Sequence, residues 1–536
     1  MSNWVRNVIA LASLCLFIGA LWCIENKRLT PSSWNTPTEY YGDTYICLGW
    51  IKAVAQGDCT LLGVKHVRRV NAPAAYADWQ NYPFPNKVEI FALGMVAKFT
   101  NLAIAGNFGL LSARLLSSVS FWLAAFFILK CSRAWAWVGA VCFSFLYYQT
   151  WRGLDHLFIG FVWTIPLFVA ATWVTLRAQW LMLVAFLVGI SSNYWVLGAL
   201  ILVVACQQSV RQRLWLVMGL SIGFVLSNLV TILYASKLSL LRTYFESERF
   251  ALKPIELLLP PPGGLFGNLS LHYQNAVDSP WRGEMFSPYL GIVGVAALVF
   301  LVHDWIVWRK GSVQFTQVCV TTICVCIGGL TAAMALCHLD MFRAANRLSE
   351  FIAAIVLLYL ATRLSDWKLP RHAHIILGGP MVGLACLEFL TFPPRQPAKE
   401  AAQKYAEDVQ FGKELDQLCS GKSLYSFPPM FFPDDVTFAR VDPYANLRPW
   451  IHTSQVSFSF GQAASHLNDF DAETFKQLKA GRINFDRLAQ AGFGGIIFTR
   501  AVFDDHMVGL LSNVTAQVIS PDFAVVKLPL VRKGPQ

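Results

Sequence analysis

Charged residues are scarce in this 536-residue chain. Aspartate, glutamate, lysine and arginine together make up 14% of it, while hydrophobic residues make up 55%. Soluble globular domains carry roughly a quarter of their residues as charges, so a soluble globule is excluded. The mean hydropathy of +0.47 also indicates a chain richer in apolar residues than a soluble protein. The composition predicts a polytopic membrane protein, long enough for one large helical membrane domain and one smaller domain outside the membrane.

Signatures of several function classes are missing as well. No glycine-rich phosphate loop follows a strand, which disfavours ATP-driven transport and the use of a cytosolic nucleotide-sugar. The thirteen cysteines include no Cys-x-x-Cys pair with partner ligands and give no metal signature. The net charge of +11 comes from basic residues scattered singly between apolar runs, so we expect no nucleic-acid partner. Cys47 and Cys59 share one loop. Two alternatives remain for them, a disulfide in an oxidising compartment or two free thiols.

Long apolar runs, in contrast, are abundant. A span takes about 20 residues, and the first candidate runs from Trp4 to Cys23 with no small-residue cleavage site after it, which favours a retained helix over a signal peptide. The run from Trp180 to Cys206 is broken at Ser191-Ser192-Asn193, which predicts two half-helices turning inside the protein. Further spans are expected at 108–129, 134–148, 158–176, 214–234, 289–308, 318–335, around 351–359 and at 375–390. We therefore predict a mainly α fold with about nine to eleven membrane helices.

Charges in the short loops predict the orientation. If the N-terminus lies inside the cell, the lysines and arginines of the short loops fall on the inner side, as the positive-inside rule requires. These residues are Lys130, Arg133, Arg177, Arg211, Arg213, Arg309, Lys310, Arg363, Lys368 and Arg371. The long loops at 25–107 and 236–287 and the tail then fall on the outer side. We expect a membrane domain over residues 1–392 and a soluble periplasmic domain over residues 393–536.

The tail differs from the rest of the chain. Short apolar segments at 423–427, 494–498 and 523–528 indicate strands, and the segments near 397–418, 472–478 and 504–513 indicate helices. This alternation predicts a small C-terminal α/β domain. The tail contains no nucleophile elbow and no paired catalytic acids, so we do not expect it to be an enzyme by itself.

The stretch Glu39-Tyr40-Tyr41-Gly42-Asp43 lies in the first outer loop. Asp43 is an acid among aromatic rings just outside the membrane, where a carboxylate can act as a general base. The same residue type in the same place is also typical of a solvated loop residue or of a helix cap, and those alternatives remain open.

Further polar residues gather on the same side. Arg343 and Arg347 are four residues apart, so on a helix they would project from one face and clamp a phosphate, with Glu350 orienting Arg347. Interface anchoring is the alternative for both arginines. Arg152, Asp155 and His156 occupy one short connection, His272 lies in the second long loop, and Asp78 lies in the first. Both histidines are equally compatible with structural hydrogen bonds.

Several short motifs occur in an order that resembles a known family. They are Gly42-Asp43 with Leu48-Gly49-Trp50, the segments 77–83 and 147–156, Asn193-Tyr194-Trp195, the segment 287–291, Arg343 with Asn346-Arg347, and the segment 491–497. Their order is similar to that of GT-C glycosyltransferases, in particular the bacterial inner-membrane group related to O-antigen-modifying glucosyltransferases. Members of that group take sugars from polyprenyl-phosphate carriers.

The resemblance implies a GT-C-like membrane enzyme with a periplasmic site. Asp43 would be the general base, and Arg343, Arg347 and Arg152 would bind the phosphate of the donor lipid. Supporting roles would fall to Tyr41, Asp78, Asp155, His156, Glu350 and His272. The acceptor would be a cell-envelope glycan such as lipopolysaccharide, a lipid or a protein. The first loop has no Asp-x-Asp or Glu-x-Asp motif, so no metal-ligating residue is assigned and dependence on a divalent metal remains open. A flippase of lipid-linked sugars and an inactive scaffold are the competing hypotheses.

Overall fold

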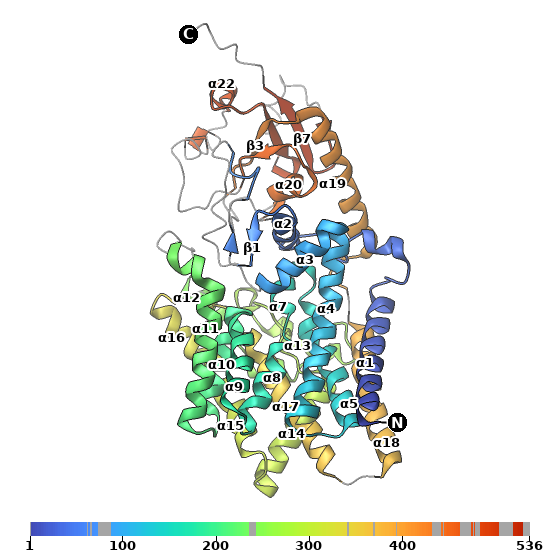
Figure 1. The fold of residues 1–536 in the computed structure, drawn as a ribbon. Helices are drawn as coiled ribbons and strands as arrows, with labels where there is room; N and C mark the ends of the chain where they lie inside the picture. The colour runs from blue at the N-terminus through green and yellow to red at the C-terminus, as the bar shows by residue number, and fades with distance from the viewer. Residues whose placement is uncertain are drawn as a thin grey trace.

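The computed structural model describes most of the chain, and every structural statement below refers to the described residues (Figure 1). These are residues 2–61, 63–64, 67–72, 87–234, 243–339, 342–367, 370–392, 394–430, 441–442, 444–460, 473–474, 476–477, 483–502 and 518–528. A helical bundle forms one end of the molecule, and a small sheet lies at the other. We call the end of the bundle nearest that sheet the sheet end.

Seven helical stretches of the described residues are long and apolar enough to cross a membrane. They are Asn3–Glu25, Leu102–Ile128, Leu154–Trp173, Val210–Leu229, Gly291–Trp308, Ala345–Asp366 and His374–Thr391. Shorter apolar helices lie at Thr44–Ala55, Ala178–Gly189, Asn193–Ala205 and Ser312–Val325. The prediction of a mainly helical polytopic membrane protein is therefore confirmed.

Helix α17 (Ser349–Asp366) is the centre of the bundle. Its residues from Ser349 to Tyr359 are all buried, because helices cover it on several sides. Around it stand α5 (Arg133–Ser144), α8 (Thr164–Trp173), α14 (Gly291–Trp308) and α15 (Ser312–Val325). In contrast, α1 (Asn3–Glu25) and α18 (Arg371–Thr391) leave most of their surface uncovered by protein. Such apolar, uncovered faces are suited to lipid.

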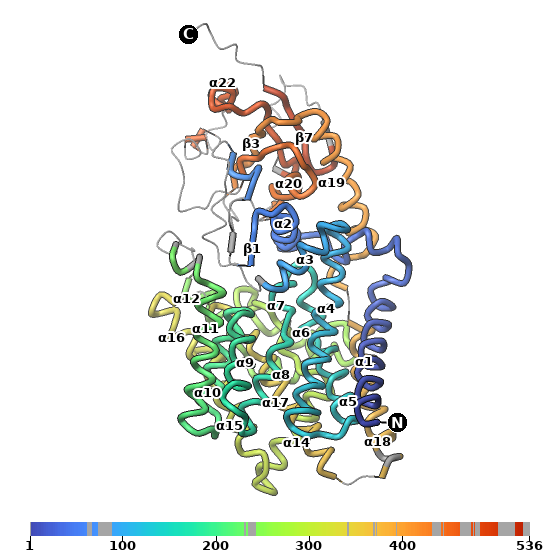
Figure 2. Tube along the Cα trace, viewed as in Figure 1, coloured from blue at the N-terminus to red at the C-terminus, as the bar shows by residue number. Residues whose placement is uncertain are grey.

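Helices α9 (Ala178–Gly189) and α10 (Asn193–Ala205) lie beside α11 (Val210–Tyr234) (Figures 1 and 2). The chain breaks at 190–192, where Ser191 and Ser192 are buried. The predicted interruption is at this position. At 1.5 Å per residue each of the two helices is about 20 Å long, which is shorter than a bilayer core of about 30 Å.

The C-terminal unit is a five-stranded mixed sheet with the order β4-β3-β5-β7-β6. The strands are β3 (Ser423–Phe427), β4 (Ser457–Phe458), β5 (Gly495–Thr499), β6 (Val518–Ile519) and β7 (Phe523–Lys527). Strand β3 pairs in parallel with β4 and β5, while β7 is antiparallel to β5 and β6. Helices α19 (Ala398–Cys419), α20 (Arg448–His452) and α22 (Phe485–Gln490) accompany it. All three predicted strands and the predicted helix near 397–418 are present. The segment 504–513 lies outside the described residues, and 472–478 is described only in part.

Helix α2 (Thr44–Ala55) lies between the bundle and the sheet, and α3 (Lys87–Phe99) lies beside it (Figure 1). Every residue of α2 from Thr44 to Val54 is buried. Its apolar side chains form one cluster with those of α19, α20 and the sheet, including Trp50, Trp450 and Phe458. A 12-residue apolar helix is too short to span a bilayer, and here the C-terminal unit covers it instead.

Polar contacts fix this interface. The Lys52 ammonium donates to the carbonyls of Trp450, Ile451 and Thr453, which belong to the end of α20. A cation at the C-terminal end of a helix stabilises carbonyls that have no partner within the helix. Cys47 and Cys59 are both buried free thiols, so the structure contains no disulfide between them.

A second set of polar contacts surrounds Tyr40. Its hydroxyl donates to Asp408 Oδ2 at 2.7 Å and lies 2.8 Å from His452 Nε2. Arg448 holds both oxygens of Asp408, at 2.7 and 2.8 Å. Burial, together with the cations Lys52 and Arg448, lowers the pKa of His452 to about 3, so this imidazole is neutral at ordinary pH.

Replacing Arg448 by methionine is expected to loosen α20 from α19 within the C-terminal unit. The change leaves the buried Asp408 carboxylate without its bidentate partner, which costs about 3–5 kcal/mol for buried ion pairs. Limited proteolysis of native membranes should cut the C-terminal unit faster in R448M than in wild type. The matched control is R500M, because the Arg500 guanidinium donates to the carbonyls of Ser520 and Pro521 at the surface. Equal cleavage of R448M and R500M would contradict this prediction.

Candidate active site

Two groups of charged side chains lie at the sheet end of the bundle. The first, which we call the acid row, consists of Asp43, His156, Asp155 and Arg395, with Glu39 beside it. The second, the arginine pair, consists of Arg152 and Arg347 joined by Glu284.

Asp43 stands at the start of α2. Gly42 precedes it with φ +49°, a left-handed conformation that glycine adopts without strain and that turns the chain into the helix. Asp43 occupies the N-cap position, but its side chain does not cap the helix. The carboxylate is 44% exposed, and Oδ2 lies 3.8 Å from His156 Nε2. The side chain thus makes no cap bond to α2, while the alternative of a solvated loop residue stays open.

The acid row continues from His156 into the protein. His156 Nδ1 lies 2.8 Å from Asp155 Oδ2, and Asp155 Oδ1 accepts a hydrogen bond of 2.6 Å from Arg395 Nη1. Asp155 is buried and pairs with Arg395. The row therefore extends from the half-exposed Asp43 carboxylate to a buried ion pair. The contact between His156 and Asp155 has the distance of an ion pair, and Nδ1 makes no hydrogen bond among the described residues.

Arg395 is held by aromatic rings as well as by Asp155. Its guanidinium lies 4.4 Å from the Trp151 ring and 5.5 Å from the Tyr41 ring, and it donates to the Trp151 carbonyl at 2.7 Å. The structure thus brings together Tyr41, Asp43, Asp155 and His156, which the sequence analysis selected separately. Arg395 was not selected, because it follows the last span in a segment with no motif.

Glu39 lies next to the acid row and was quoted in the sequence analysis only as the start of the Asp43 stretch. Its Oε2 accepts a hydrogen bond of 3.0 Å from the backbone N–H of Leu154. Burial and the neighbouring Asp155 carboxylate raise the pKa of Glu39 to about 7, although Arg395 lowers it. Glu39 is therefore protonated in part of the molecules near neutral pH.

The arginine pair is organised by Glu284, which precedes α14 in the chain. Arg152 Nη2 donates to Glu284 Oε2, and Arg347 Nη2 donates to Oε1 at 2.7 Å. Burial alone would raise the pKa of Glu284, but the two guanidiniums outweigh it and hold that pKa well below the usual range. Tyr148 and Tyr194 lie 4.7 and 4.8 Å from the two guanidiniums, respectively. Two predicted phosphate ligands, Arg152 and Arg347, thus share one carboxylate that the sequence analysis missed.

The prediction that Arg343 and Arg347 project from one face of a helix is wrong. The backbone forms a short 3-10 helix at Ala345–Leu348, and Arg343 precedes it. Arg343 pairs with Glu246 at 3.0 Å, whereas Arg347 pairs with Glu284. The expected orientation of Arg347 by Glu350 is also not observed, because Glu284 takes that place.

Three more predicted residues are placed as follows. Glu350 is buried at the first turn of α17, where Arg152 and Arg114 are the cations that act on it electrostatically. His272 lies with an exposed side chain on α13 (Gly267–Ala276), and neither charged group includes it. Asp78 lies outside the described residues.

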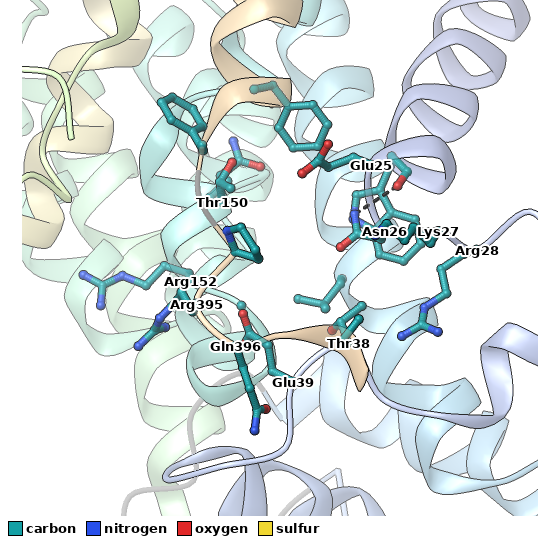
Figure 3. A pocket seen from close by; sticks show the side chains of 18 of the residues that line it. Glu25, Asn26, Lys27, Arg28, Thr38, Glu39, Thr150, Arg152, Arg395 and Gln396 are labelled. Carbon is teal, nitrogen blue, oxygen red and sulfur yellow. Dashed lines mark hydrogen bonds between the residues drawn. The ribbon is translucent and has the colours of Figure 1, made fainter. Parts of the chain in front are cut away.

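A cavity of about 700 Å³ lies beside Glu39, between the ends of α1, α4 (Leu102–Leu123), α6 (Tyr147–Trp151) and α18 (Figure 3). Its charged lining residues are Glu25, Lys27, Arg28, Glu39, Arg114, Arg152, Arg395 and Lys399. In Figure 3 the guanidiniums of Arg152 and Arg395 lie at one side of the cavity, across from Lys27 and Arg28. Asp43 is not among the lining residues of this cavity. Within the described part of the chain, no three histidine, cysteine or acidic residues are grouped to hold a metal ion.

No protein-family model and no curated protein matches the chain. Among solved structures, the chain is similar to ArnT from Cupriavidus metallidurans, with 100% of both chains covered. The apo form gives 12% identity and a TM-score of 0.45, and the form bound to undecaprenyl phosphate gives 11% and 0.43. The chain is also similar to the arabinofuranosyltransferase AftD from Mycobacteria, at 12% identity and a TM-score of 0.46, over 98% of this chain and 41% of AftD. At these values no residue role is carried from those proteins to this one.

Proposed function

We propose that this protein is a membrane glycosyltransferase that moves a sugar from a polyprenyl-phosphate carrier to a glycan, lipid or protein acceptor of the cell envelope. The observation that supports it best is the acid row, in which a half-exposed carboxylate is backed by a histidine, a buried acid and an arginine. The site would lie on the periplasmic side of a bacterial inner membrane. The N-terminus would be cytoplasmic, with a membrane domain over residues 1–392 and an outer domain over 393–536.

In this proposal Asp43 is the general base. Its carboxylate takes the proton of an acceptor hydroxyl, the hydroxyl oxygen forms a bond to the anomeric carbon, and the bond from that carbon to the phosphate oxygen breaks. The electron pair of the broken bond stays with the polyprenyl phosphate. His156 lies between the two acids, with Nε2 3.8 Å from Asp43 and Nδ1 2.8 Å from Asp155, so it would tune the charge of the base through space.

The arginines would take up the charge of the departing phosphate. Arg343 is partly exposed, and Arg347 lies near it in the chain. The Nε and Nη1 atoms of Arg152 are buried without a hydrogen-bond partner among the described residues, so these donors are available to a ligand. Preorganised cations stabilise charge that develops in the transition state more effectively than water does.

The proposal predicts that the full-length protein in neutral lipid nanodiscs transfers radiolabelled sugar from a synthetic polyprenyl-phosphate donor to an envelope extract. Thin-layer separation of product from donor measures the transfer. A flippase would instead move the labelled donor across a sealed vesicle without forming product. Donor translocation without product, over several sugars, would reject the glycosyltransferase in favour of the transporter.

A further inference from the structure

Tyr40 makes contacts that the transfer step at Asp43 does not require. It is 0% exposed, and its hydroxyl contacts Asp408 of α19 at 2.7 Å and lies 2.8 Å from Nε2 of His452 at the end of α20. These partners are 368 and 412 residues further along the chain, in the C-terminal unit. The side chain of Tyr40 thus fastens the first loop to that unit, three residues before the proposed base.

The backbone of Tyr40 is held by Gln396. The Tyr40 N–H donates to Gln396 Oε1 at 2.7 Å, and Gln396 is 7% exposed in the short connection between α18 and α19. The other end of the same amide, Nε2, donates to Glu400 Oε1 at 3.2 Å in the first turn of α19. Figure 3 shows Gln396 beside Glu39 in the wall of the cavity. A buried amide with partners on both sides holds the two segments at a fixed separation.

The residue before Gln396 belongs to the acid row. Arg395 Nη1 donates to Asp155 Oδ1 at 2.6 Å, and its guanidinium lies 5.5 Å from the ring of Tyr41, the residue after Tyr40. Two adjacent residues of the connection thus contact two adjacent residues of the first loop. A shift of Gln396 would therefore act on the acid row through Arg395 as well as through the first loop.

On the other side of Tyr40, Glu39 ties the first loop to the connection that carries Asp155. Glu39 Oε2 accepts a hydrogen bond of 3.0 Å from the Leu154 N–H. This approach depends on Gly153, because a Cβ atom there would overlap the Glu39 carboxylate. The first loop is therefore held by the bundle through Glu39 and by the start of the C-terminal unit through Gln396.

We infer that Gln396 is a positioning residue of the proposed transferase. Through the Tyr40 N–H it holds the first loop so that the Asp43 carboxylate stays beside His156. The tight turn at 41–44, closed by a backbone hydrogen bond of 3.0 Å, would pass any displacement of Tyr40 on to Asp43. The C-terminal unit then contributes alignment rather than chemistry. The inference rests on the proposed function and deepens it, because it makes the rate of transfer depend on how the C-terminal unit is docked.

The first measurement is hydrogen exchange of the full-length protein in neutral lipid nanodiscs, read by mass spectrometry in a peptide that covers residues 39–47. Q396M keeps the length of the side chain and removes the acceptor for the Tyr40 N–H. The peptide should exchange about two- to tenfold faster in Q396M, the range for loss of one net hydrogen bond. The matched control is Q403M, because Gln403 donates to Glu407 on the exposed surface of α19. It should exchange like wild type.

The double variant Q396E/E400Q swaps the two side chains of this contact. The introduced carboxylate can accept from the Tyr40 N–H and from the introduced amide, so both hydrogen bonds and the net charge are kept. Exchange should return to the wild-type rate. Q396N keeps a buried amide but is one methylene too short to reach Tyr40, so it should exchange as fast as Q396M and takes its place if Q396M does not fold.

The second measurement is steady-state sugar transfer. The kcat of Q396M should fall about tenfold to a hundredfold, because a misplacement of about 1 Å at a reacting group has an effect of that size. The KM for the polyprenyl-phosphate donor should stay at the wild-type value, since the contacts of Gln396 do not include the arginine pair. Q396E/E400Q should recover kcat. A general loss of packing would instead lower the melting temperature and change KM together with kcat.

Wild-type exchange in both Q396M and Q396N would overturn the inference, and so would faster exchange with transfer at the wild-type rate. A swapped pair that still exchanges fast would assign the effect to packing and would also overturn it. If the wild-type protein transfers no sugar from any donor, the proposed function fails, and the exchange series alone then decides whether Gln396 holds the first loop.

Discussion

The D43N variant is expected to lose sugar transfer by about 10²–10⁴-fold, the range that a general base contributes. The amide keeps the shape of the carboxylate but cannot take a proton from the acceptor hydroxyl. The position suits this test, because the Asp43 side chain is 44% exposed and asparagine keeps its shape. The measurement is the transfer rate in nanodiscs at saturating donor, with donor binding followed separately.

The matched control for D43N is D278N, since Asp278 is an exposed acid at the N-cap of a short helix in the second long loop. This variant should transfer sugar at the wild-type rate. A D43N protein that binds donor normally and transfers at the wild-type rate would remove Asp43 from the chemistry. Glu39, the other acid beside the row, would then be the next base to test.

The strands of the C-terminal unit and the break before α10 could be predicted from the sequence, because each depends on residues that are neighbours in the chain. The strands at 423–427, 495–499 and 523–527 are short apolar segments, and glycines such as Gly421 and Gly492 turn the chain with positive φ just before two of them. The break before α10 likewise followed from polar residues inside an apolar run. In each of these cases the signal and the structure lie within a few residues of one another.

The charged site depended on contacts that no local pattern contains. Glu284 joins Arg152 and Arg347 across separations of 132 and 63 residues, and Arg395 reaches Asp155 across 240. The helical spacing of Arg343 and Arg347 was misleading, because Ala344 has φ −99° and ψ 72° and interrupts the helix between them. Spacing predicts a shared face only where the backbone is helical throughout.

The position of helix α2 in the first loop also depends on contacts with residues that are distant in the sequence. Helix α2 is apolar apart from Thr44 and Lys52, and a helix that is apolar on nearly all sides is typically buried. In the structure it is the common core of the bundle and the C-terminal unit, since its residues pack in one cluster with α19, α20 and the sheet. The stretch that carries Asp43 is therefore fixed by the tail of the chain, which links the proposed site to a unit that has no catalytic motif of its own.

The E284Q variant is expected to destabilise the protein by about 3–5 kcal/mol, the cost of leaving a buried charge without its partner. Glutamine keeps the shape of the side chain, but Arg152 and Arg347 then lie side by side with no counter-charge between them. Thermal unfolding of the purified protein in detergent measures the loss. The control is E246Q, because Glu246 pairs with Arg343 at a site where both side chains are more than a quarter exposed, and such pairs contribute about 0–1 kcal/mol.

The double variant E284Q/R347Q separates charge from shape. It restores the net charge of the wild-type arrangement, one positive charge in excess, and should recover part of the stability that E284Q loses. The pH dependence follows from the lowered pKa of Glu284. A carboxyl with a depressed folded pKa stabilises the fold above its unfolded pKa of about 4.3 and loses that contribution as the pH falls through the folded value. The stability gap between wild type and E284Q should therefore be constant from neutral pH down to about pH 5 and narrow only in stronger acid. An E284Q protein that melts with wild type at pH 7 would contradict this prediction and would show that solvent or another acid compensates the charge of the two arginines.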